Sequence, residues 1–145
     1  MVRVLIVDDE PTILKMVSSS LTNAGFDTYT CHMWPGVANL VRSVRPDLVL
    51  LDYNMPGVNG GDICQILRRN PLGADMKIVL YSAEDEGDLA RIVNECGADG
   101  YIKKSTRGAQ LVSVLGKLLK AGGAPRRASS RNSTLTEGDA AVSLA

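Results

Sequence analysis

The sequence predicts an α/β domain in which five parallel strands form a doubly wound sheet covered by helices on both faces. Two observations favour this fold: short apolar, strand-like runs alternate five times with helical periods, and the joints between them are mostly short. A third is length, since 145 residues are enough to bury one sizeable core. We therefore expect a single folded domain.

The five predicted strands are short runs rich in aliphatic and β-branched residues. The third and fourth runs are almost continuously apolar, as expected for strands buried on both faces, whereas the second alternates like a half-buried strand near a sheet edge. In chain order the runs are VRVLIV (2–7), FDTYTC (26–31), DLVLLD (47–52), KIVLYS (77–82) and GYIKK (100–104).

Each strand is followed by a stretch with apolar residues at three- and four-residue steps, which predicts a helix. Gly25 and Gly97 stand where the C-terminal caps of the first and fourth helices are expected. Pro35 suits the first turn of the second helix, and Pro71 limits the third. The predicted ranges are 11–24, 35–44, 61–69, 86–96 and 107–120.

The composition changes from Ala121 onward. Residues 121–145 are rich in Ala, Ser, Gly and Arg, with no aromatic residue and no sustained apolar period. We predict that residues 1–120 form the folded domain and that 121–145 are a disordered tail or linker, too short to be an output domain.

Composition excludes several classes of protein. Sixteen basic residues balance sixteen acidic ones, so there is no electrostatic footprint for nucleic acid or an anionic membrane. No apolar run is long enough for a signal-peptide core or a membrane span. The three cysteines lack framework spacing, which favours reduced, buried thiols. We expect a cytoplasmic protein that binds neither nucleic acid nor membranes directly.

Chemically useful residue types recur where the predicted strands end. Ligands of open α/β sheets bind outside the carboxyl ends of the strands, at the point where strand order reverses. The second strand ends in Cys31 and His32, which offer nothing of this kind, so an outer position and the order 2-1-3-4-5 are predicted. The residues that end the other four strands are Asp8, Asp9, Asp52, Ser82, Lys103 and Lys104.

Several carboxylates at one edge repel each other unless a cation intervenes. An all-oxygen set without a His or Cys ligand cluster favours a hard cation, and Mg²⁺ is the natural candidate. The chain has no Gly-rich phosphate-binding loop, which makes a bound nucleotide unexpected. A carboxylate between a divalent cation and a lysine can instead attack phosphorus and form an acyl phosphate.

The segments VLIVDDE, PDLVLLDYNMPGVNG, IVLYSA and GADGYIKK, with their intervals, resemble the receiver domain of bacterial two-component response regulators over residues 1–120. The resemblance implies a CheY-like receiver with a flavodoxin-like fold. A stand-alone receiver is the expectation, and a fragment whose tail led to an effector is the alternative. It implies that Asp52 accepts a phosphoryl group from a histidine kinase or histidine phosphotransfer protein, and that the phosphoprotein signals by contact with a downstream protein. It implies no turnover enzyme, only autophosphorylation and autodephosphorylation.

The resemblance also implies a Mg²⁺ ligand set. Asp9, Asp52 and the backbone carbonyl of Asn54 are the implied direct ligands, and Asp8 is implied to act mainly through water.

Further roles follow from the same resemblance. Ser82 is implied to hydrogen-bond the phosphoryl group, Lys104 to pair with it, and Tyr101 to rotate inward when the Ser82 hydroxyl moves. Asn54 and Glu84 are implied to tune the dephosphorylation rate. Ser105 departs from the family, which usually has proline after the lysine; a trans peptide bond or a more mobile loop is the expected consequence.

Alternative interpretations stay open at this point. Asp8 or Asp9 alone suits a helix cap, and Tyr101 suits an ordinary core position. A phosphate-independent interaction module and a Mg²⁺-dependent phosphohydrolase are the competing classes of function. The cognate kinase, the downstream target and homodimerisation through the fourth helix, fifth strand and fifth helix are not determined by the sequence.

Overall fold

The computed structural model of the protein describes residues 1–55, 57–69 and 75–120. Five parallel strands form one sheet in the order β2-β1-β3-β6-β7, which confirms the predicted order. Pro71 and the predicted tail, 121–145, lie outside the described residues. The strands are β1 (Arg3–Val7), β2 (Asp27–Cys31), β3 (Leu48–Asp52), β6 (Lys77–Ser82) and β7 (Gly100–Lys103).

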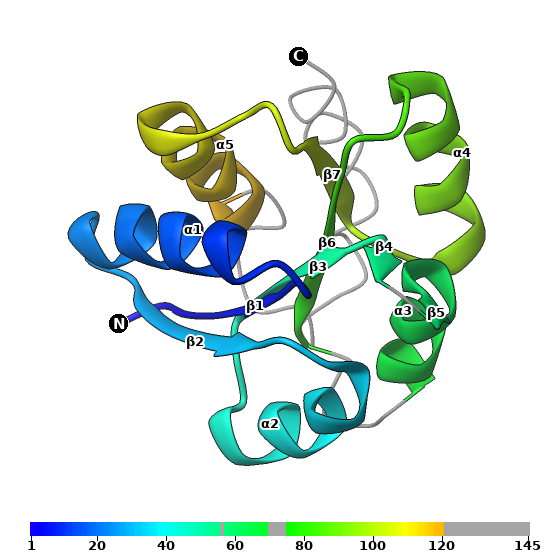
Figure 1. Ribbon diagram of the computed structural model, residues 1–145, viewed down its shortest axis with the longest axis horizontal. Helices are drawn as coiled ribbons and strands as arrows, with labels where there is room; N and C mark the ends of the chain where they lie inside the picture. The colour runs from blue at the N-terminus through cyan, green and yellow to red at the C-terminus, as the bar shows by residue number, and fades with distance from the viewer. Residues whose placement is uncertain (56, 70–74, 121–145) are drawn as a thin grey trace.

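In the described part of the chain, five helices cover the sheet. Figure 1 shows α1 and α5 together on one face, and α2, α3 and α4 on the other. A 3-10 turn, η1 (Trp34–Gly36), precedes α2 and contains Pro35, close to the predicted helix start. No helix in the described part of the chain is long and apolar enough to cross a bilayer. The helices are α1 (Pro11–Asn23), α2 (Val37–Val44), α3 (Gly60–Arg69), α4 (Glu86–Cys96) and α5 (Gly108–Lys120).

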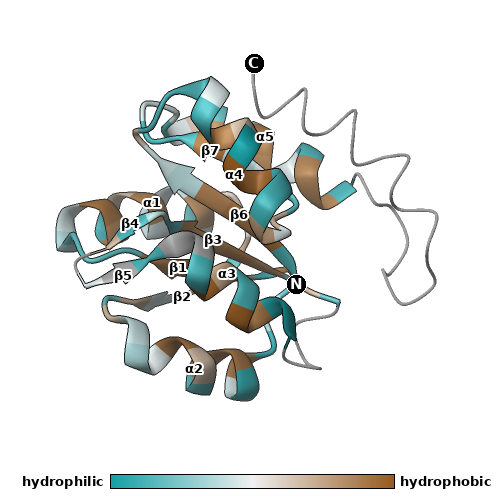
Figure 2. Ribbon diagram, turned by 90° about the vertical axis from the view of Figure 1, so that its right-hand side faces the viewer, coloured by the Kyte–Doolittle hydropathy of each residue, from teal (hydrophilic) through white to brown (hydrophobic). Residues whose placement is uncertain are grey.

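The sheet divides the core into two layers, because successive side chains of a strand point to opposite faces. Leu5 and Val7 belong to the cluster on the α2, α3 and α4 side, whereas Val4 and Ile6 belong to the cluster under α1 and α5. All five residues of β3 are buried, in agreement with the continuous apolar run of its first four residues. Figure 2 shows the apolar strands β3 and β6 between helices of mixed hydropathy.

The helix ends follow the predicted glycine signals. Gly25 has φ +97° and Gly97 has φ +83°, a left-handed conformation that favours glycine. Strand β2 begins one residue later than predicted, at Asp27, because the Phe26 N–H bonds the Leu21 carbonyl at 3.0 Å and Phe26 therefore belongs to the turn that closes α1.

A two-stranded antiparallel hairpin between β3 and α3 was not predicted. It pairs β4 (Asn54–Met55) with β5 (Val58–Asn59), and Gly57 in its turn has φ +79°. Two-residue strands are too short to show a periodicity of two, so sequence patterns do not reveal them. The hairpin holds the backbone directly after Asp52, including Asn54, in a defined conformation.

Arg68 joins α3 to the loop that leads into β7. Its guanidinium donates to the Met76 carbonyl at 2.8 Å and the Gly97 carbonyl at 3.3 Å, and forms an ion pair with Asp99 at 2.6 Å. The same Asp99 oxygen accepts the Ile78 N–H at 2.8 Å. The side chains of Arg68 and Asp99 are 22% and 10% exposed, so this pair is shielded from water more than a surface ion pair is.

We expect Arg68→Met to lower the free energy of unfolding by about 2–4 kcal/mol, because it leaves the Asp99 carboxylate without its cation and two carbonyls without a donor. The neighbouring Arg69 is exposed, so Arg69→Met is a matched control with an expected change within about 0.5 kcal/mol. Urea denaturation of the two variants measures the difference. Equal stabilities would contradict a structural role for the Arg68 network.

Candidate functional site

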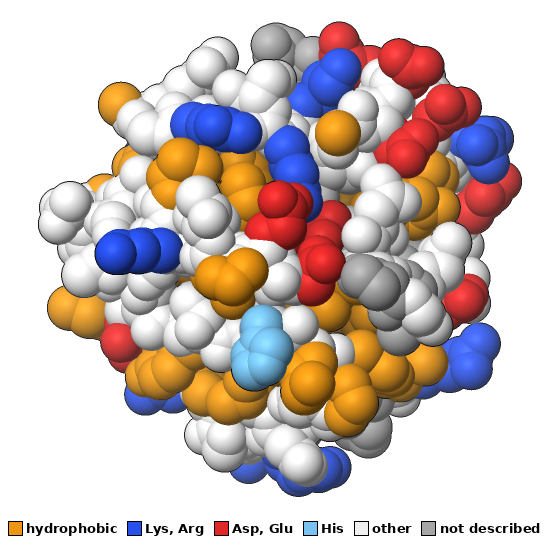
Figure 3. Space-filling view, in the orientation of Figure 1, with side chains coloured by type: hydrophobic (Ala, Val, Ile, Leu, Met, Phe, Trp, Pro, Cys, Tyr) orange, Lys and Arg blue, Asp and Glu red, His pale blue; other side chains and the backbone are white. Residues whose placement is uncertain are grey.

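The carboxyl ends of four strands bring the predicted site residues to one edge of the sheet. Asp8 directly follows β1, Asp52 ends β3, Ser82 ends β6 and Lys104 directly follows β7. Asp8 and Asp52 are each 1% exposed and Ser82 is fully buried. Figure 3 shows acidic side chains beside a basic one at the centre of the corresponding face of the molecule.

Asp8, Asp9 and Asp52 form an acidic cluster. One carboxylate oxygen from each lies within 4.8 Å of the other two. Two of the three carboxylates are buried, where an uncompensated charge is costly. This spacing is short enough for one small cation to contact all three residues, directly or through water.

The side chain of Lys104 reaches into this cluster. Its Nζ lies 2.9 Å from Asp8 Oδ2, 3.3 Å from Asp52 Oδ1 and 3.7 Å from Glu10 Oε1. Burial alone would lower the pKa of Lys104, but hydrogen bonding and charge attraction from Asp8 and Asp52 outweigh it, and the net shift is upward. Lys103 forms no ion pair with any described residue, so Lys104 is the lysine that the fold directs to the acids.

The Asp52 carboxyl group has a raised pKa of about 6. Burial is the largest cause and the negative charge of Asp8 is the second; the Asn54 N–H, which donates to Asp52 Oδ1 at 3.1 Å, and Lys104 act in the opposite direction. One ammonium group therefore does not fully compensate the cluster. A further cation at this point would favour the ionised form of Asp52.

The donor set fits Mg²⁺. Three carboxylates facing one ammonium leave an excess of two negative charges, which a divalent cation would neutralise. The donors are oxygens, with no histidine or cysteine in the described cluster, as a hard cation prefers. Asp8, Asp9 and Asp52 are the residues that would hold it, together with the predicted Asn54 carbonyl.

Ser82, Asn54 and Glu84 form a hydrogen-bonded group beside the acids. Ser82 Oγ accepts the Glu84 N–H at 3.1 Å and contacts Asn54 Nδ2 at 3.5 Å. Asn54 Nδ2 also donates to Glu84 Oε2 at 3.1 Å. The structure thus brings the hydroxyl predicted to hold a phosphoryl group into contact with the two residues predicted to tune its loss.

Tyr101 lies in the core on the α2, α3 and α4 side of the sheet and is 2% exposed. Its hydroxyl has no hydrogen-bond partner among the residues that the structure describes. Burial, and to a lesser degree Glu86 at the start of α4, raise the pKa of this phenol. The ring occupies an inward position, and a core role and a switch role are both compatible with it.

Tyr81 also supports the site, although sequence patterns indicated only a strand position for it. Its hydroxyl donates to the Thr106 carbonyl at 3.0 Å and lies 3.4 Å from the Lys104 carbonyl, while the Lys104 Nζ lies 6.0 Å from its ring centroid. The Lys104 N–H donates to the Ser82 carbonyl at 2.8 Å. The position of Tyr81, a phenol one residue before the end of a buried strand, is the sequence feature that could have indicated this supporting role.

The loop that carries Lys104 contains Ser105 where the family usually has proline. The peptide bond before Ser105 is trans, since no described peptide bond is cis. Of the two expected consequences, the structure has the trans bond. In this loop Arg107 Nε donates to the Lys104 carbonyl at 3.1 Å, and the Tyr81 hydroxyl lies 3.4 Å from the same carbonyl.

Neither aspartate caps α1. The N-cap residue is Glu10, and no side chain hydrogen-bonds the first turn. Asp8 Oδ1 instead accepts the Glu10 N–H at 2.9 Å, and its other oxygen pairs with Lys104. The cap interpretation is therefore wrong, and the two oxygens of Asp8 are used to hold the loop and the lysine.

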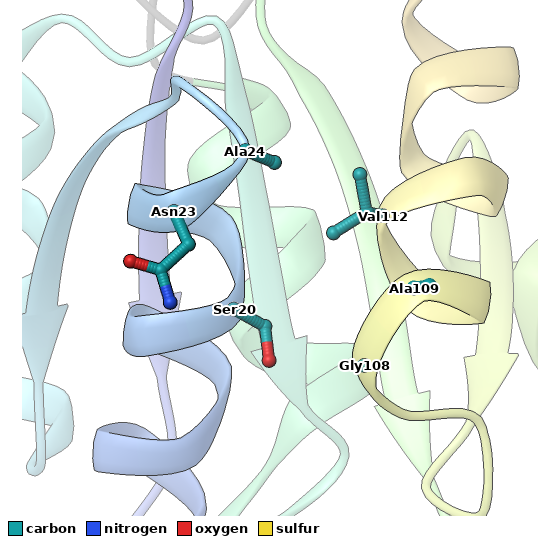
Figure 4. A pocket seen from close by; sticks show the side chains of 6 residues that line it. All are labelled: Ser20, Asn23, Ala24, Gly108, Ala109 and Val112. Atoms are coloured by element: carbon teal, nitrogen blue, oxygen red, sulfur yellow. The ribbon is translucent and has the colours of Figure 1, made fainter.

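A separate shallow groove of about 300 Å³ lies between α1 and α5 (Figure 4). None of its lining residues is charged, and none belongs to the acidic cluster. It contributes nothing to cation or phosphoryl binding. The lining residues are Ser20, Asn23, Ala24, Gly108, Ala109 and Val112.

The structure is thus an α/β domain whose five-stranded parallel sheet carries acids, a hydroxyl and a lysine at one edge, where they could hold a cation and an anionic group. Comparison with known families matches residues 4–116 to the response regulator receiver domain. The chain belongs to this family, as the sequence resemblance indicated.

The chain is similar in sequence to part of two bacterial regulatory proteins. It is 37% identical over 111 residues to the DNA-binding response regulator MtrA of Mycolicibacterium smegmatis, covering 77% of this chain and 47% of that protein. It is 33% identical over 117 residues to the phosphate regulon transcriptional regulatory protein PhoB of Pseudomonas aeruginosa, covering 81% and 51%. The chain thus spans about half the length of the curated relatives it matches.

Solved structures of receiver domains share the fold. The chemotaxis response regulator CheY4 of Vibrio cholerae superposes with a TM-score of 0.76 at 25% identity, over 81% of this chain and 98% of that one. The BeF3-activated N-terminal receiver domain of Klebsiella pneumoniae RstA gives 0.73 at 28% identity, over 81% and 98%.

Proposed function

We propose that this receiver domain, residues 1–120, is a phosphoacceptor switch. Asp52 accepts a phosphoryl group from a histidine kinase or histidine phosphotransfer protein in the presence of Mg²⁺. The observation that carries the proposal is the contact of Lys104 with two members of the Asp8, Asp9 and Asp52 cluster. A lysine in this place can pair with the carboxylate that acts as nucleophile and with the phosphoryl group that this carboxylate attacks.

Each residue has a role in the transfer. An oxygen of Asp52 attacks phosphorus while the bond from phosphorus to the donor nitrogen breaks, and the product is an aspartyl phosphate. Bound Mg²⁺ supplies positive charge to the carboxylates and to the phosphoryl oxygens. Lys104 pairs with one phosphoryl oxygen. The Ser82 oxygen accepts the Glu84 N–H, so its own proton is available to a phosphoryl oxygen.

The same contacts explain a switch. A phosphoryl oxygen on Asp52 can accept the Ser82 proton while the Ser82 oxygen still accepts from the Glu84 N–H and Asn54, and the added charge is stabilised best where Ser82 and Lys104 both bind it. Phosphorylation therefore shifts the population toward that arrangement, and the change extends to Tyr101 and α4. Asn54 and Glu84 border the phosphoryl group and tune its hydrolysis.

The signal is proposed to pass to a downstream protein by contact. Glu84 is partly exposed and Asp85, Glu86 and Asp88 are exposed at the start of α4, where Figure 3 shows a group of acidic side chains. This is the end of α4 nearest Ser82 in the chain. DNA binding is the property named for MtrA, and direct nucleic-acid binding is not proposed for this chain. Homodimerisation and a cytoplasmic location stay predictions.

The test is incubation with acetyl phosphate, with and without Mg²⁺, followed by intact mass measurement of the wild type, Asp52→Asn and the control Asp62→Asn. Asp62 is exposed on α3, outside the cluster. We expect one Mg²⁺-dependent phosphoryl group on the wild type and the control, and none on Asp52→Asn. Adduct formation that ignores Mg²⁺ or survives in Asp52→Asn would overturn the proposal.

Two further readouts separate the competing classes. A phosphate-independent interaction module would show no saturable Mg²⁺ binding at the cluster. A phosphohydrolase would turn over small phosphate esters repeatedly, whereas the switch forms one long-lived adduct per chain.

A further inference from the structure

Two of the three cysteines face each other between α3 and α4. Cys64 lies in the middle of α3 and Cys96 is the last residue of α4. Both are free thiols, and they are 0% and 6% exposed. Cys64 Sγ donates to the Cys96 carbonyl at 3.5 Å, and both side chains belong to the same buried core cluster. The Cys64 thiol therefore lies against Cys96 across the helix interface.

The backbone around the pair is held in place from both sides. Gln65 Nε2 donates to the Glu95 carbonyl at 3.4 Å, and Arg68 Nε donates to the Gly97 carbonyl at 3.3 Å. These bonds join the same turn of α3 to the residues before and after Cys96. The approach of Cys64 to Cys96 is thus a fixed feature of the interface between α3 and α4.

The environment makes the two thiols unequal. The neighbouring Cys64 thiol, followed by the Ala98 N–H, lowers the pKa of Cys96 to about 7 against the opposing effect of burial. The same interaction and burial raise the pKa of Cys64. A thiol of low pKa beside one that keeps its proton is the arrangement of an attacking and a resolving cysteine. Cys31 instead donates to the Met33 carbonyl at 3.1 Å.

We propose that Cys64 and Cys96 are a peroxide-sensitive dithiol that oxidises reversibly to a disulfide. The Cys96 thiolate attacks a hydroperoxide, the O–O bond breaks, and a sulfenic acid forms with release of water or an alcohol. The Cys64 sulfur then attacks the Cys96 sulfur, the S–O bond breaks, and the leaving hydroxide takes the Cys64 proton and departs as water. Two thiols are oxidised and one peroxide is reduced; a dithiol reductant reverses the change.

The disulfide would join the middle of α3 to the end of α4. Because α4 is the helix proposed to respond to Asp52, the crosslink would restrict that response. This consequence rests on the proposed function, whereas the oxidation chemistry does not. Disulfides of reducing compartments are usually transient and redox-sensing, which agrees with a reversible site.

The test is peroxide treatment of the folded, full-length chain, quenching by acid, alkylation of the remaining thiols and tryptic mapping without reductant. Trypsin places each cysteine in its own peptide, since cleavage follows Lys and Arg except before proline. Those peptides are 16–42 with Cys31, 43–68 with Cys64, and 92–103 with Cys96. We expect peptides 43–68 and 92–103 to be joined, the protein to lose two hydrogen atoms, and only Cys31 to be alkylated.

Three variants and one condition complete the test. Cys31→Ser is expected to form the crosslink at the wild-type rate, and Cys64→Ser and Cys96→Ser are expected to lose it. Oxidation in denaturant is the reference, in which crosslinks to Cys31 also form. The proposal is overturned if the folded wild type shows crosslinks to Cys31, over-oxidised Cys96 without a crosslink, or no reaction until denaturant is added. None of these readouts depends on phosphorylation.

Discussion

Lys104→Met is expected to lower the free energy of unfolding by about 3–5 kcal/mol in Mg²⁺-free buffer at pH 8, because removing one partner leaves buried charges uncompensated. The lysine side chain is 16% exposed and lies within 3.3 Å of both Asp8 and Asp52. Most domains have only about 5–15 kcal/mol of stability, so this is a large effect. The variant is also expected to lose most of its Mg²⁺-dependent phosphorylation.

Both pH and Mg²⁺ should change the amount of stability that Lys104→Met loses. Without Lys104 the pKa of Asp52 rises above its value of about 6, so protonation of Asp52 relieves the variant at pH 5 more than at pH 8. Mg²⁺ should restore more stability to the variant than to the wild type, because it replaces a missing positive charge. Urea denaturation at the two pH values, with and without Mg²⁺, measures both effects.

Lys103→Met is the matched control. The neighbouring lysine ends β7 and makes no ion pair with a described residue, so its replacement should change stability by no more than about 0.5 kcal/mol. Similar losses for the two variants would mean that the cluster is not what makes Lys104 important.

Asp52→Asn is expected to stabilise the Mg²⁺-free protein above pH 6. The folded-state pKa of Asp52 is raised from 3.8 to about 6, so the folded state binds the proton more tightly than the unfolded chain does. The contribution of this group is therefore favourable below pH 4 and is lost as pH rises through about 6. A shift of this size corresponds to at most about 3 kcal/mol, and we expect about 1–3 kcal/mol.

The measurement is the difference in unfolding free energy between wild type and Asp52→Asn at pH 4 and pH 8, with EDTA present. The difference should favour the variant at pH 8 and be smaller at pH 4. Asp9→Asn is the comparison, because Asp9 belongs to the same cluster but is only partly buried, and its effect should be smaller. A destabilised Asp52→Asn at pH 8 would contradict the conclusion that this carboxylate is held at a cost to folding.

Much of the fold followed from patterns that are strong in the sequence. The buried strand Leu48–Asp52 is apolar throughout except for its last residue, and Gly25 and Gly97 mark helix ends through their left-handed conformation. The order of strands could be inferred because the ends of four strands carry polar groups and the second does not. Apolar runs, capping glycines and polar strand ends can all be recognised from neighbouring residues in the sequence. The parallel sheet then brings the carboxyl ends of the strands to one edge.

The parts that the sequence did not predict depend on contacts between distant residues. The hairpin of Asn54–Met55 with Val58–Asn59 is too short to have a period. The hydrogen bonds of Tyr81 to the loop after β7 require the register between β6 and β7. The meeting of Cys64 and Cys96 depends on how α3 packs against α4, and their separation in the chain gives no indication of it.

The most direct test of the central claim is to locate the phosphoryl group chemically. An acyl phosphate is reduced by borohydride, which converts the modified aspartate to homoserine, and trypsin then releases residues 43–68 with Asp52 inside. If Asp52 is the phosphorylated residue, incubation with acetyl phosphate and Mg²⁺ followed by reduction is expected to give homoserine at position 52 and nowhere else. Homoserine at Asp8 or Asp9, or a phosphoryl group that borohydride does not remove, would contradict it.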